Sequence, residues 1–337
     1  MDGAFMRYVI IGAGAIGGAV GGRLRQAGQD VVLVARGAQY EVLRERGLRL
    51  VGPDGVAEVA VPVVDGPEAL ELTAEDVLVL AVKTQDAITA LDAWASRPVE
   101  GGGTAGERLP LVCAQNGVES ERLALRRFRR VYGMCVFLPA TYLEPGVITV
   151  RCAPYTGALN LGRYPSGADE TARAIADGLE KANFLAPVTS EVMRWKYAKL
   201  LGNLANAVEA VCGSLAGEEE KSLVAEAQAE AVRVLDAAGI DRATREEQSE
   251  LRAGRVEVRP VEGGGPAGGS TWQSLRRGGG AVEADYLNGE IVLLGRLHGI
   301  ATPVNEGLLR VANDFARSGR EPGSMTGAEL ARAAGGV

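Results

Sequence analysis

Continuous apolar runs alternate with helical periods along the first half of the chain. The apolar runs predict buried strands at residues 7–11, 30–35, 77–82 and 109–114. Stretches with a helical period, such as 16–27 and 86–96, separate these strands. Strands that are apolar throughout and alternate with helices are typical of a parallel sheet that is covered on both faces.

From about residue 191 the apolar positions follow a helical period instead. Residues 131–163, which come before this change, are expected to be extended pieces joined by Pro-Gly turns. Helices are expected at residues 191–211, 218–238, 271–277, 283–298 and 303–317. A Gly/Pro-rich break at 262–270 is predicted to be a loop. The last part of the chain is therefore predicted to be all helical.

A glycine-rich turn, GAGAIGG, follows the first predicted strand and precedes a helix. Gly12 permits a tight turn, Gly14 lets a pyrophosphate approach the backbone, and Gly17 lets the helix pack close to the strand. A packing turn without a ligand is the alternative, but the strand–turn–helix context favours dinucleotide binding. The candidate cofactor-binding residues of this turn are Gly12, Ala13, Gly14, Ala15, Ile16 and Gly17.

The second predicted strand ends at Ala35 and Arg36. NAD-selective folds usually carry Asp or Glu near this point, where it binds the ribose hydroxyls. A carboxylate would repel a 2′-phosphate, whereas a guanidinium can bind one through two hydrogen bonds. A solvated surface arginine is the alternative interpretation of Arg36. We expect NADP(H) rather than NAD(H) as the cofactor.

Together these patterns predict an α/β protein with two domains. The N-terminal domain, residues 1–190, is expected to be a Rossmann-type doubly wound parallel sheet that binds NADP. The C-terminal all-helical domain, residues 191–330, is expected to carry substrate-binding and catalytic residues.

Two further strand ends carry candidate residues. Lys83 follows the strand at 77–82, and Asn116 follows the strand at 109–114. Ligands of doubly wound folds gather at the carboxyl ends of the strands, so both side chains are candidates for the cleft. The alternatives are a solvated charge for Lys83 and a turn-forming role for Asn116.

A polar stripe marks the helix predicted over 191–211. Lys196, Lys199, Asn203 and Asn206 share one arc about 80° wide, with aliphatic residues to one side. A solvated helix face is the alternative, but two asparagines in a helix interior are poor helix formers. The stripe is therefore a candidate functional surface.

A second polar cluster lies at 270–290. Because the chain has one histidine, proton transfer would fall mainly to Lys, Glu, Asp or Tyr, and Glu283 or Asp285 could serve. Acids favoured by the helix dipole in a first turn are the alternative for both. Ser270 and Thr271 are candidate helix caps.

Composition and charge narrow the functional classes to which the protein can belong. The net charge of −7 argues against a nucleic-acid-binding surface, and no apolar run is long enough to predict a membrane span. Four scattered cysteines without a CxxC pair, beside a single histidine, argue against a metal site. Scattered cysteines also suggest reduced thiols and a cytoplasmic location.

Nearly the whole chain resembles the ketopantoate reductase (2-dehydropantoate 2-reductase) family. The resemblance is carried by GAGAIGG, AVKTQD, AQNGVES, KLLGNLANA and VEADYLNGEIVLLGRLHGIATPVN. It implies NADPH-dependent reduction of the 2-keto group of ketopantoate to pantoate, in the biosynthesis of pantothenate and coenzyme A. It also implies an active site between a Rossmann domain and a helical domain.

The resemblance also implies roles for single residues. Lys199 matches the family's proton donor, and Asn203 matches an asparagine that holds the substrate. Asn116 lies at a position near the nicotinamide and the substrate, and Glu283 matches the family's late glutamate. Lys83 and Ala140 are further cofactor-binding candidates.

Departures from the family pattern lie on the substrate side. Ala207 stands where a second helix asparagine is expected, and Asn206 is a candidate replacement. Thr271, with Ser270 beside it, stands where the family's substrate-binding serine is expected. Lys196 lies on the stripe but off the family motif, and we expect its side chain at the rim or in solvent.

Two alternatives stay open beside a ketopantoate reductase. One is a related reductase of another keto or imino acid in secondary metabolism, which the changes at Ala207 and Thr271 motivate. The other is a non-catalytic NADPH-sensing protein, which the presence of Lys199 and Asn203 disfavours. We expect a small-molecule 2-ketoacid as the substrate, and we leave a homodimer open.

Overall fold

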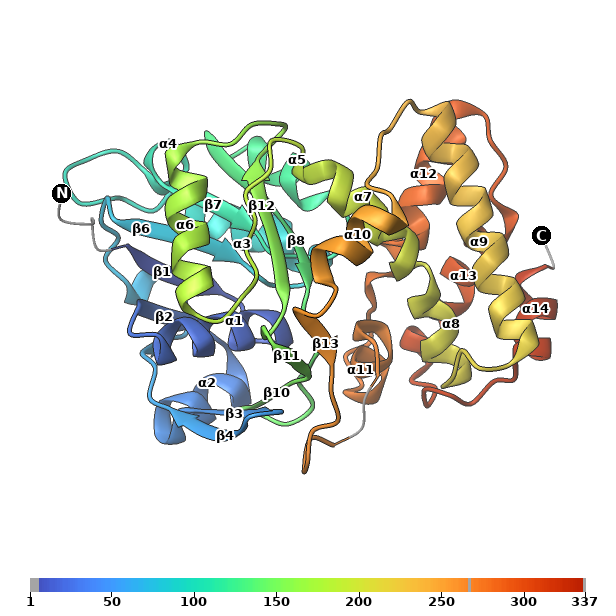
Figure 1. Cartoon of the computed structure of the whole chain (residues 1–337), viewed down its shortest axis with the longest axis horizontal. Helices are drawn as coiled ribbons and strands as arrows, with labels where there is room; N and C mark the ends of the chain where they lie inside the picture. Colours follow the sequence, from blue (N-terminus) through green and yellow to red (C-terminus); the bar gives the residue numbers. More distant parts are fainter. Residues whose placement is uncertain (1–5, 266–267, 336–337) are drawn as a thin grey trace. The chain divides into compact units, whose positions relative to one another are not determined.

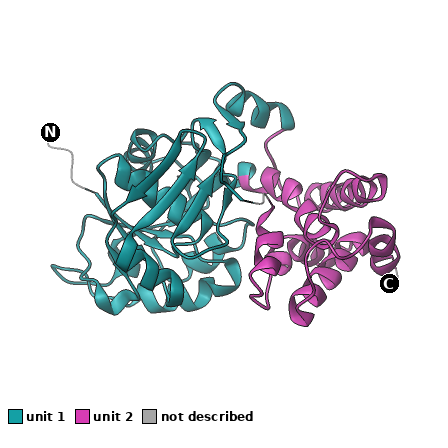
Figure 2. Ribbon diagram, turned by 90° about the horizontal axis from the view of Figure 1, so that it is seen from below, with its two compact units in different colours: residues 1–195, 245–265 teal, residues 196–244, 266–337 magenta. Residues whose placement is uncertain are grey.

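The structure is a computed structural model, and it describes residues 6–265 and 268–335 (Figure 1). The chain divides into two compact units (Figure 2). Unit 1 contains the residues up to 195 together with 245–265, and unit 2 contains 196–244 and the residues after 265. The division therefore differs from a single boundary at 190, because residues 245–265 return to unit 1.

Two short strands pair where residues 245–265 rejoin unit 1. Strand β13 (Val256–Val258) pairs antiparallel with β11 (Cys152–Pro154). Helix α10 (Arg245–Arg252) precedes β13, and neither element was expected from the sequence. Helix α10 is short and mostly polar, and β13 has only three residues, so neither carries an apolar period long enough to have predicted it.

The main sheet of unit 1 is parallel except at one edge. In spatial order its strands are β12 (Ala158–Arg163), β8 (Arg130–Phe137), β7 (Pro110–Cys113), β6 (Asp76–Leu80), β1 (Arg7–Ile11), β2 (Asp30–Val34) and β5 (Val63–Val64). Only β12 runs antiparallel to its neighbour. The chain order reverses beside β1, which is the switch point where doubly wound sheets bind their ligands.

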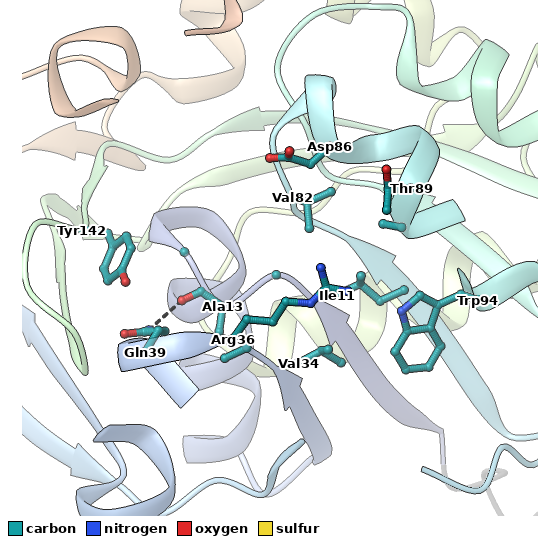
Figure 3. A pocket seen from close by; sticks show the side chains of 14 residues that line it. Ile11, Ala13, Val34, Arg36, Gln39, Val82, Asp86, Thr89, Trp94 and Tyr142 are labelled. Atoms are coloured by element: carbon teal, nitrogen blue, oxygen red, sulfur yellow. Dashed lines mark hydrogen bonds between the residues drawn. The ribbon is translucent and has the colours of Figure 1, made fainter. Parts of the chain in front are cut away.

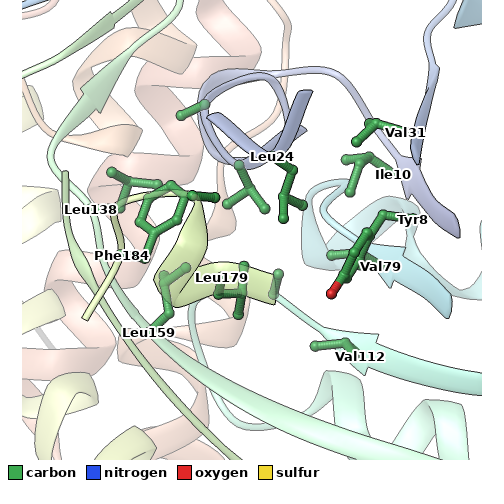
Figure 4. Packing of buried hydrophobic residues seen from close by; sticks show 14 of the residues in the cluster. Tyr8, Ile10, Leu24, Val31, Val79, Val112, Leu138, Leu159, Leu179 and Phe184 are labelled. Atoms are coloured by element: carbon green, nitrogen blue, oxygen red, sulfur yellow. The ribbon is translucent and has the colours of Figure 1, made fainter. Parts of the chain in front are cut away.

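Helices cover both faces of this sheet, as the apolar strands predict. One face packs against α1 (Ala15–Gln26) and α6 (Glu170–Lys181), and the other against α3 (Ala87–Ala95), α4 (Ala105–Arg108) and α5 (Ser120–Leu125). In β1, Tyr8 and Ile10 join the first core, whereas Val9 and Ile11 join the second. Figure 4 shows the first core. The predicted α/β fold class is confirmed.

A smaller sheet packs beside α1. Its strands, in spatial order, are β4 (Gly55–Val59), β3 (Leu48–Gly52), β10 (Val147–Val150) and β9 (Ala140–Thr141). Helix α2 (Gly37–Arg46) leads into β3. A side chain at Gly18 of α1 would meet Ile148 at 2.8 Å, so the glycine permits this close packing. The smaller sheet thus brings residues 140–150 beside the first 60.

Short 3₁₀ turns complete unit 1, and the regular elements in the described residues of unit 2 are all helical. The turns of unit 1 are η1 (Pro67–Ala69) and η2 (Thr84–Asp86). Helix α7 (Val192–Asn203) runs from unit 1 into unit 2. The other elements of unit 2 are α8 (Ala205–Cys212), α9 (Glu218–Ala237), α11 (Ser270–Arg276), η3 (Glu283–Tyr286), α12 (Asn288–His298), α13 (Pro303–Ser318) and α14 (Gly327–Ala334). Across 6–265 and 268–335, the structure holds no helix with the length and apolar character that a membrane span requires.

Candidate functional site

The glycine-rich turn has the tight geometry that its pattern predicts. Gly12 has φ +105°, and a Cβ there would lie 2.8 Å from the backbone nitrogen of Val82. A Cβ at Gly17 would overlap the carbonyl oxygen of Gly12, so α1 could not pack so close to β1. A Cβ at Gly14 would meet nothing within 4 Å, which leaves the approach to this backbone open.

The turn also presents donors suited to an anion. The N–H groups of Gly12 and Ala13 both donate to the carbonyl oxygen of Val34, each at 3.1 Å. The next three N–H groups, of Gly14, Ala15 and Ile16, donate no hydrogen bond within the described part of the chain. Amides at a helix N-terminus carry partial positive charge, so this set can bind a phosphate group.

A pocket of about 440 Å³ lies against the turn in unit 1 (Figure 3). Its walls come from the turn, the end of β2, the start of α2, the segment after β6, α3, and the chain near β9. Lining residues beyond the turn include Arg36, Gln39, Asp86, Thr89, Trp94 and Tyr142. Half of the sequence candidates for the turn, Gly12, Ala13 and Gly14, line the pocket, and Ala15, Ile16 and Gly17 continue into α1 behind them.

Arg36 lines this pocket directly after β2. It occupies the N-cap position of α2 and is exposed, while the preceding Ala35 is buried. Its side chain extends along the pocket wall (Figure 3). Among the lining residues the single carboxylate is that of Asp86, which comes from the segment after β6. The wall at the end of β2 therefore carries a positive group and no acid.

Lys83 and Asn116 follow the carboxyl ends of adjacent strands. Strands β6 and β7 pair in parallel, and Thr84 Oγ1 lies 3.5 Å from the carbonyl oxygen of Asn116. Both candidates are half-buried at this edge, although neither lines the pocket described above. Ala140, at the start of β9, also lies outside the pocket lining, whereas Tyr142 two residues later belongs to it.

The polar stripe lies on α7, and one prediction for it is wrong. Lys199 is half-buried, and Asn203, one turn later, is 9% exposed. Lys196 was expected at the rim or in solvent, but it is 3% exposed. It lies four residues after Val192 and four before Leu200, both buried, so it shares the packed face of the helix. Helical spacing groups the four polar residues on one arc, but it does not show which edge of that arc faces the protein interior.

A break after Asn203 also divides the helix predicted over 191–211. A single residue, Leu204, separates α7 from α8. Side chains of neighbouring helices hold the carbonyl groups beside this break. The Gln228 amide donates to the oxygen of Leu201 at 3.1 Å, and the Asn288 amide donates to the oxygen of Leu204 at 3.4 Å.

A buried hydrogen-bond network supports Asn288 in turn. Asn288 Nδ2 donates to Asn305 Oδ1 at 3.0 Å, and Asn305 Nδ2 donates to Glu230 at 2.8 Å. The Glu230 carboxylate also accepts from the backbone N–H groups of Val304 at 2.9 Å and Asn305 at 3.0 Å, which caps α13. All three polar side chains are at most 4% exposed. The network joins the N-terminus of α13 to the break beside Asn203.

Replacement of Glu230 with alanine should destabilise unit 2. It would leave the buried amides of Val304 and Asn305 without their acceptor, so we expect the apparent free energy of unfolding to fall by about 3 kcal/mol. The matched control is Glu226→Ala one turn earlier, where the residue is exposed and a change within about 0.5 kcal/mol is expected. Urea titration of both variants measures the difference, and equal stability of the two would contradict the importance of the network.

The second polar cluster of unit 2 comes together only in part. Asn206 Nδ2 donates to Ser270 Oγ at 3.4 Å, which joins α8 to the start of α11. Neither Ser270 nor Thr271 is the cap of α11, because Gly269 holds that position and its N–H donates to the Glu209 carboxylate. Thr271 is 2% exposed.

The late acids differ from each other in burial. Glu283 begins the 3₁₀ turn η3, before α12, and is 5% exposed. Asp285 is exposed and accepts a hydrogen bond from Asn313 Nδ2 at 3.0 Å. Glu283 is therefore a buried acid, whereas Asp285 is an ordinary surface acid. No group of three or more His, Cys, Asp or Glu side chains suited to a metal ion occurs in the described residues.

Two family models match the chain. The first, for ketopantoate reductase PanE/ApbA, covers residues 8–166, and the second, for its C-terminal part, covers 191–316. The 2-dehydropantoate 2-reductase of Mesorhizobium japonicum is 30% identical over 347 residues, which is 92% of this chain and 98% of that protein. The enzyme of the same name from Pyrococcus horikoshii is 26% identical and covers 89% and 94%.

Solved structures share the fold along nearly the whole chain. A PanE/ApbA family ketopantoate reductase from Ralstonia eutropha has a TM-score of 0.75 at 25% identity and covers 94% of this chain and all of its own. D-mandelate dehydrogenase with NADH and anilino(oxo)acetate has a TM-score of 0.78 at 21% identity, which shows the fold alone, and covers 93% and 99%. Because both family models match and together span most of its length, the chain belongs to the ketopantoate reductase PanE/ApbA family of oxidoreductases.

Proposed function

We propose that this protein reduces ketopantoate (2-dehydropantoate) to pantoate with NADPH. One observation carries the choice of cofactor: the pocket lined by Gly12, Ala13 and Gly14 of the glycine-rich turn is also lined by Arg36, with no acid at the end of β2. The comparisons with related proteins support the family and the oxidoreductase class of this chain. The cofactor, the substrate and the roles of single residues are the proposal.

The residues of unit 1 fit an NADPH molecule. The amides of Gly14, Ala15 and Ile16 would bind the pyrophosphate, and Arg36 would bind the 2′-phosphate. Lys83 and Ala140 are proposed to hold further parts of the cofactor. When bound, the reduced nicotinamide supplies a hydride for the 2-keto carbon.

Lys199 is proposed to give a proton to the carbonyl oxygen as the keto group becomes an alcohol. Its positive charge also stabilises negative charge that develops on that oxygen. Asn203 follows one helical turn later, so the two side chains can contact the same substrate oxygen. Glu283 is proposed to assist at the substrate, and Asn116 is proposed to serve both substrate and cofactor.

The substrate's remaining polar groups are proposed to bind Asn206, Ser270 and Thr271. The hydrogen bond from Asn206 to Ser270 supports Asn206 as the substitute for the family asparagine that is absent at Ala207. Ala207 itself is 2% exposed, so its methyl group packs in the core of unit 2.

Ketopantoate should be reduced more efficiently than pyruvate. Its branched carbon skeleton and hydroxyl offer contacts that pyruvate lacks, so we expect kcat/KM to be higher by at least about tenfold. NADPH oxidation measured across a panel of 2-ketoacids, with pantoate identified by mass spectrometry, tests this. If ketopantoate is inert while another ketoacid turns over, the substrate assignment fails and the reductase assignment stands.

A second candidate function is reduction of another keto or imino acid. The observation that favours it is the pair of departures at Ala207 and Thr271, where an amide and a serine would be expected. The same panel, extended to cyclic imino acids, distinguishes this candidate from the first.

A further inference from the structure

Gln39 makes two hydrogen bonds that the proposed function does not use. It lies on α2, three residues after Arg36, and is 7% exposed at the wall of the pocket. Its Nε2 donates to the carbonyl oxygen of Ala13 at 2.7 Å, and its Oε1 accepts from the N–H of Gly146 at 2.7 Å. Figure 3 shows the first of these bonds. The side chain therefore joins two segments that are 133 residues apart.

The bond to Ala13 controls a donor of the glycine-rich turn. The carbonyl of Ala13 and the N–H of Gly14 belong to one planar trans peptide unit, so they point in opposite directions. Fixing the carbonyl toward Gln39 fixes the Gly14 N–H away from it. Glycine rotates easily about φ and ψ, so this peptide would otherwise adopt several orientations. The N–H of Ala13 is already held by Val34, so Gln39 secures the next peptide along.

The bond to Gly146 secures another part of the pocket wall. Gly146 has φ +79° and lies in the turn between β9 and β10. The same turn contains Tyr142, which lines the pocket. The carbonyl oxygen of Gly146 accepts from the N–H of Arg49 at 2.8 Å, so the turn is held on both sides. One amide side chain thus ties the glycine-rich turn to the segment that carries Tyr142.

We propose that Gln39 is a positioning residue for the cofactor's pyrophosphate. It orients the Gly14 N–H toward the diphosphate through its bond to Ala13, and it fixes the segment that carries Tyr142 through its bond to Gly146. This inference rests on the proposed binding of NADPH in the pocket. It assigns to Gln39 an effect on the diphosphate that is separate from the recognition of the 2′-phosphate.

Two variants and two ligands test the assignment. Gln39→Leu removes both hydrogen bonds, whereas Gln39→Asn keeps a neutral amide that is one methylene too short to reach both partners. We expect both to raise the Kd of NADPH by about tenfold or more, because an orientation held by a buried hydrogen bond is lost. The Kd of 2′-AMP, which has no diphosphate, should stay within about twofold, and kcat at saturating NADPH within about threefold.

Gln26→Leu is the matched control, since Gln26 is exposed at the end of α1 and should leave both affinities unchanged. Equal weakening of NADPH and 2′-AMP binding would overturn the proposal, as would unchanged NADPH binding in either variant. If Gln39→Leu does not fold, the result for Gln39→Asn decides alone. Failure of the unaltered protein to bind NADPH would be a different result, because it removes the proposed function itself.

Discussion

Replacing Lys199 with alanine is expected to lower kcat by about 10²–10⁴, as the loss of a positioned general acid does. The Kd of NADPH should change by less than about threefold, because the proposed cofactor contacts lie in the glycine-rich turn and at Arg36. Steady-state kinetics with saturating ketoacid and fluorescence titration with NADPH measure the two quantities. Loss of turnover with intact cofactor binding is the signature of a residue that acts on the substrate.

Two other lysines serve as controls for this result. Lys221 is exposed on α9 and pairs with Glu218 at 2.8 Å, so Lys221→Ala should leave kcat unchanged. Lys196 is buried one turn before Lys199, so Lys196→Met should lower the melting temperature clearly and kcat only slightly. An inactive but folded Lys196 variant beside an active Lys199 variant would place the acid one turn earlier than we propose.

Replacing Arg36 with alanine is expected to raise the KM for NADPH by about tenfold to hundredfold. A charged hydrogen-bonding contact is worth roughly 1.5–3 kcal/mol, and each 1.4 kcal/mol corresponds to about tenfold in affinity. The KM for NADH, which lacks the 2′-phosphate, should change by less than about threefold. The expected outcome is therefore a loss of cofactor preference at nearly constant kcat.

Arg44→Ala provides the matched control for Arg36. Arg44 lies on the same helix, is exposed, and pairs with Glu41 at 2.7 Å, away from the pocket lining. It should leave both KM values unchanged. Equal use of NADPH and NADH by the unaltered protein, or an equal loss for both cofactors in Arg36→Ala, would contradict the assignment of Arg36 to the 2′-phosphate.

Local pattern predicted the parts of this protein whose geometry is local. The turn at Gly12 and Gly17 needs glycine for reasons that involve only β1, α1 and the neighbouring strand, and its motif states them. The apolar strands likewise predict a sheet covered on both faces. These features depend on steric limits and on burial, which spacing along the chain expresses directly.

Features that depend on distant partners could not be predicted in this way. Lys196 was expected in solvent because its polarity was read without knowledge of which helix face is packed. The break at Leu204 is supported by Gln228 and Asn288, which lie 27 and 84 residues from the carbonyls they bind. Gln39 carries no motif, and only its bonds to Ala13 and Gly146 reveal its place at the pocket.

Isotope transfer tests the central claim most directly. NADPH carrying deuterium at C4 of the nicotinamide, in each of the two stereochemical forms, is incubated with ketopantoate and the purified protein. One form should yield pantoate with a single deuterium at C2, and the other should yield unlabelled pantoate, as stereospecific hydride transfer to the keto carbon requires. No NADPH-dependent pantoate, or pantoate unlabelled from both forms, would contradict the account.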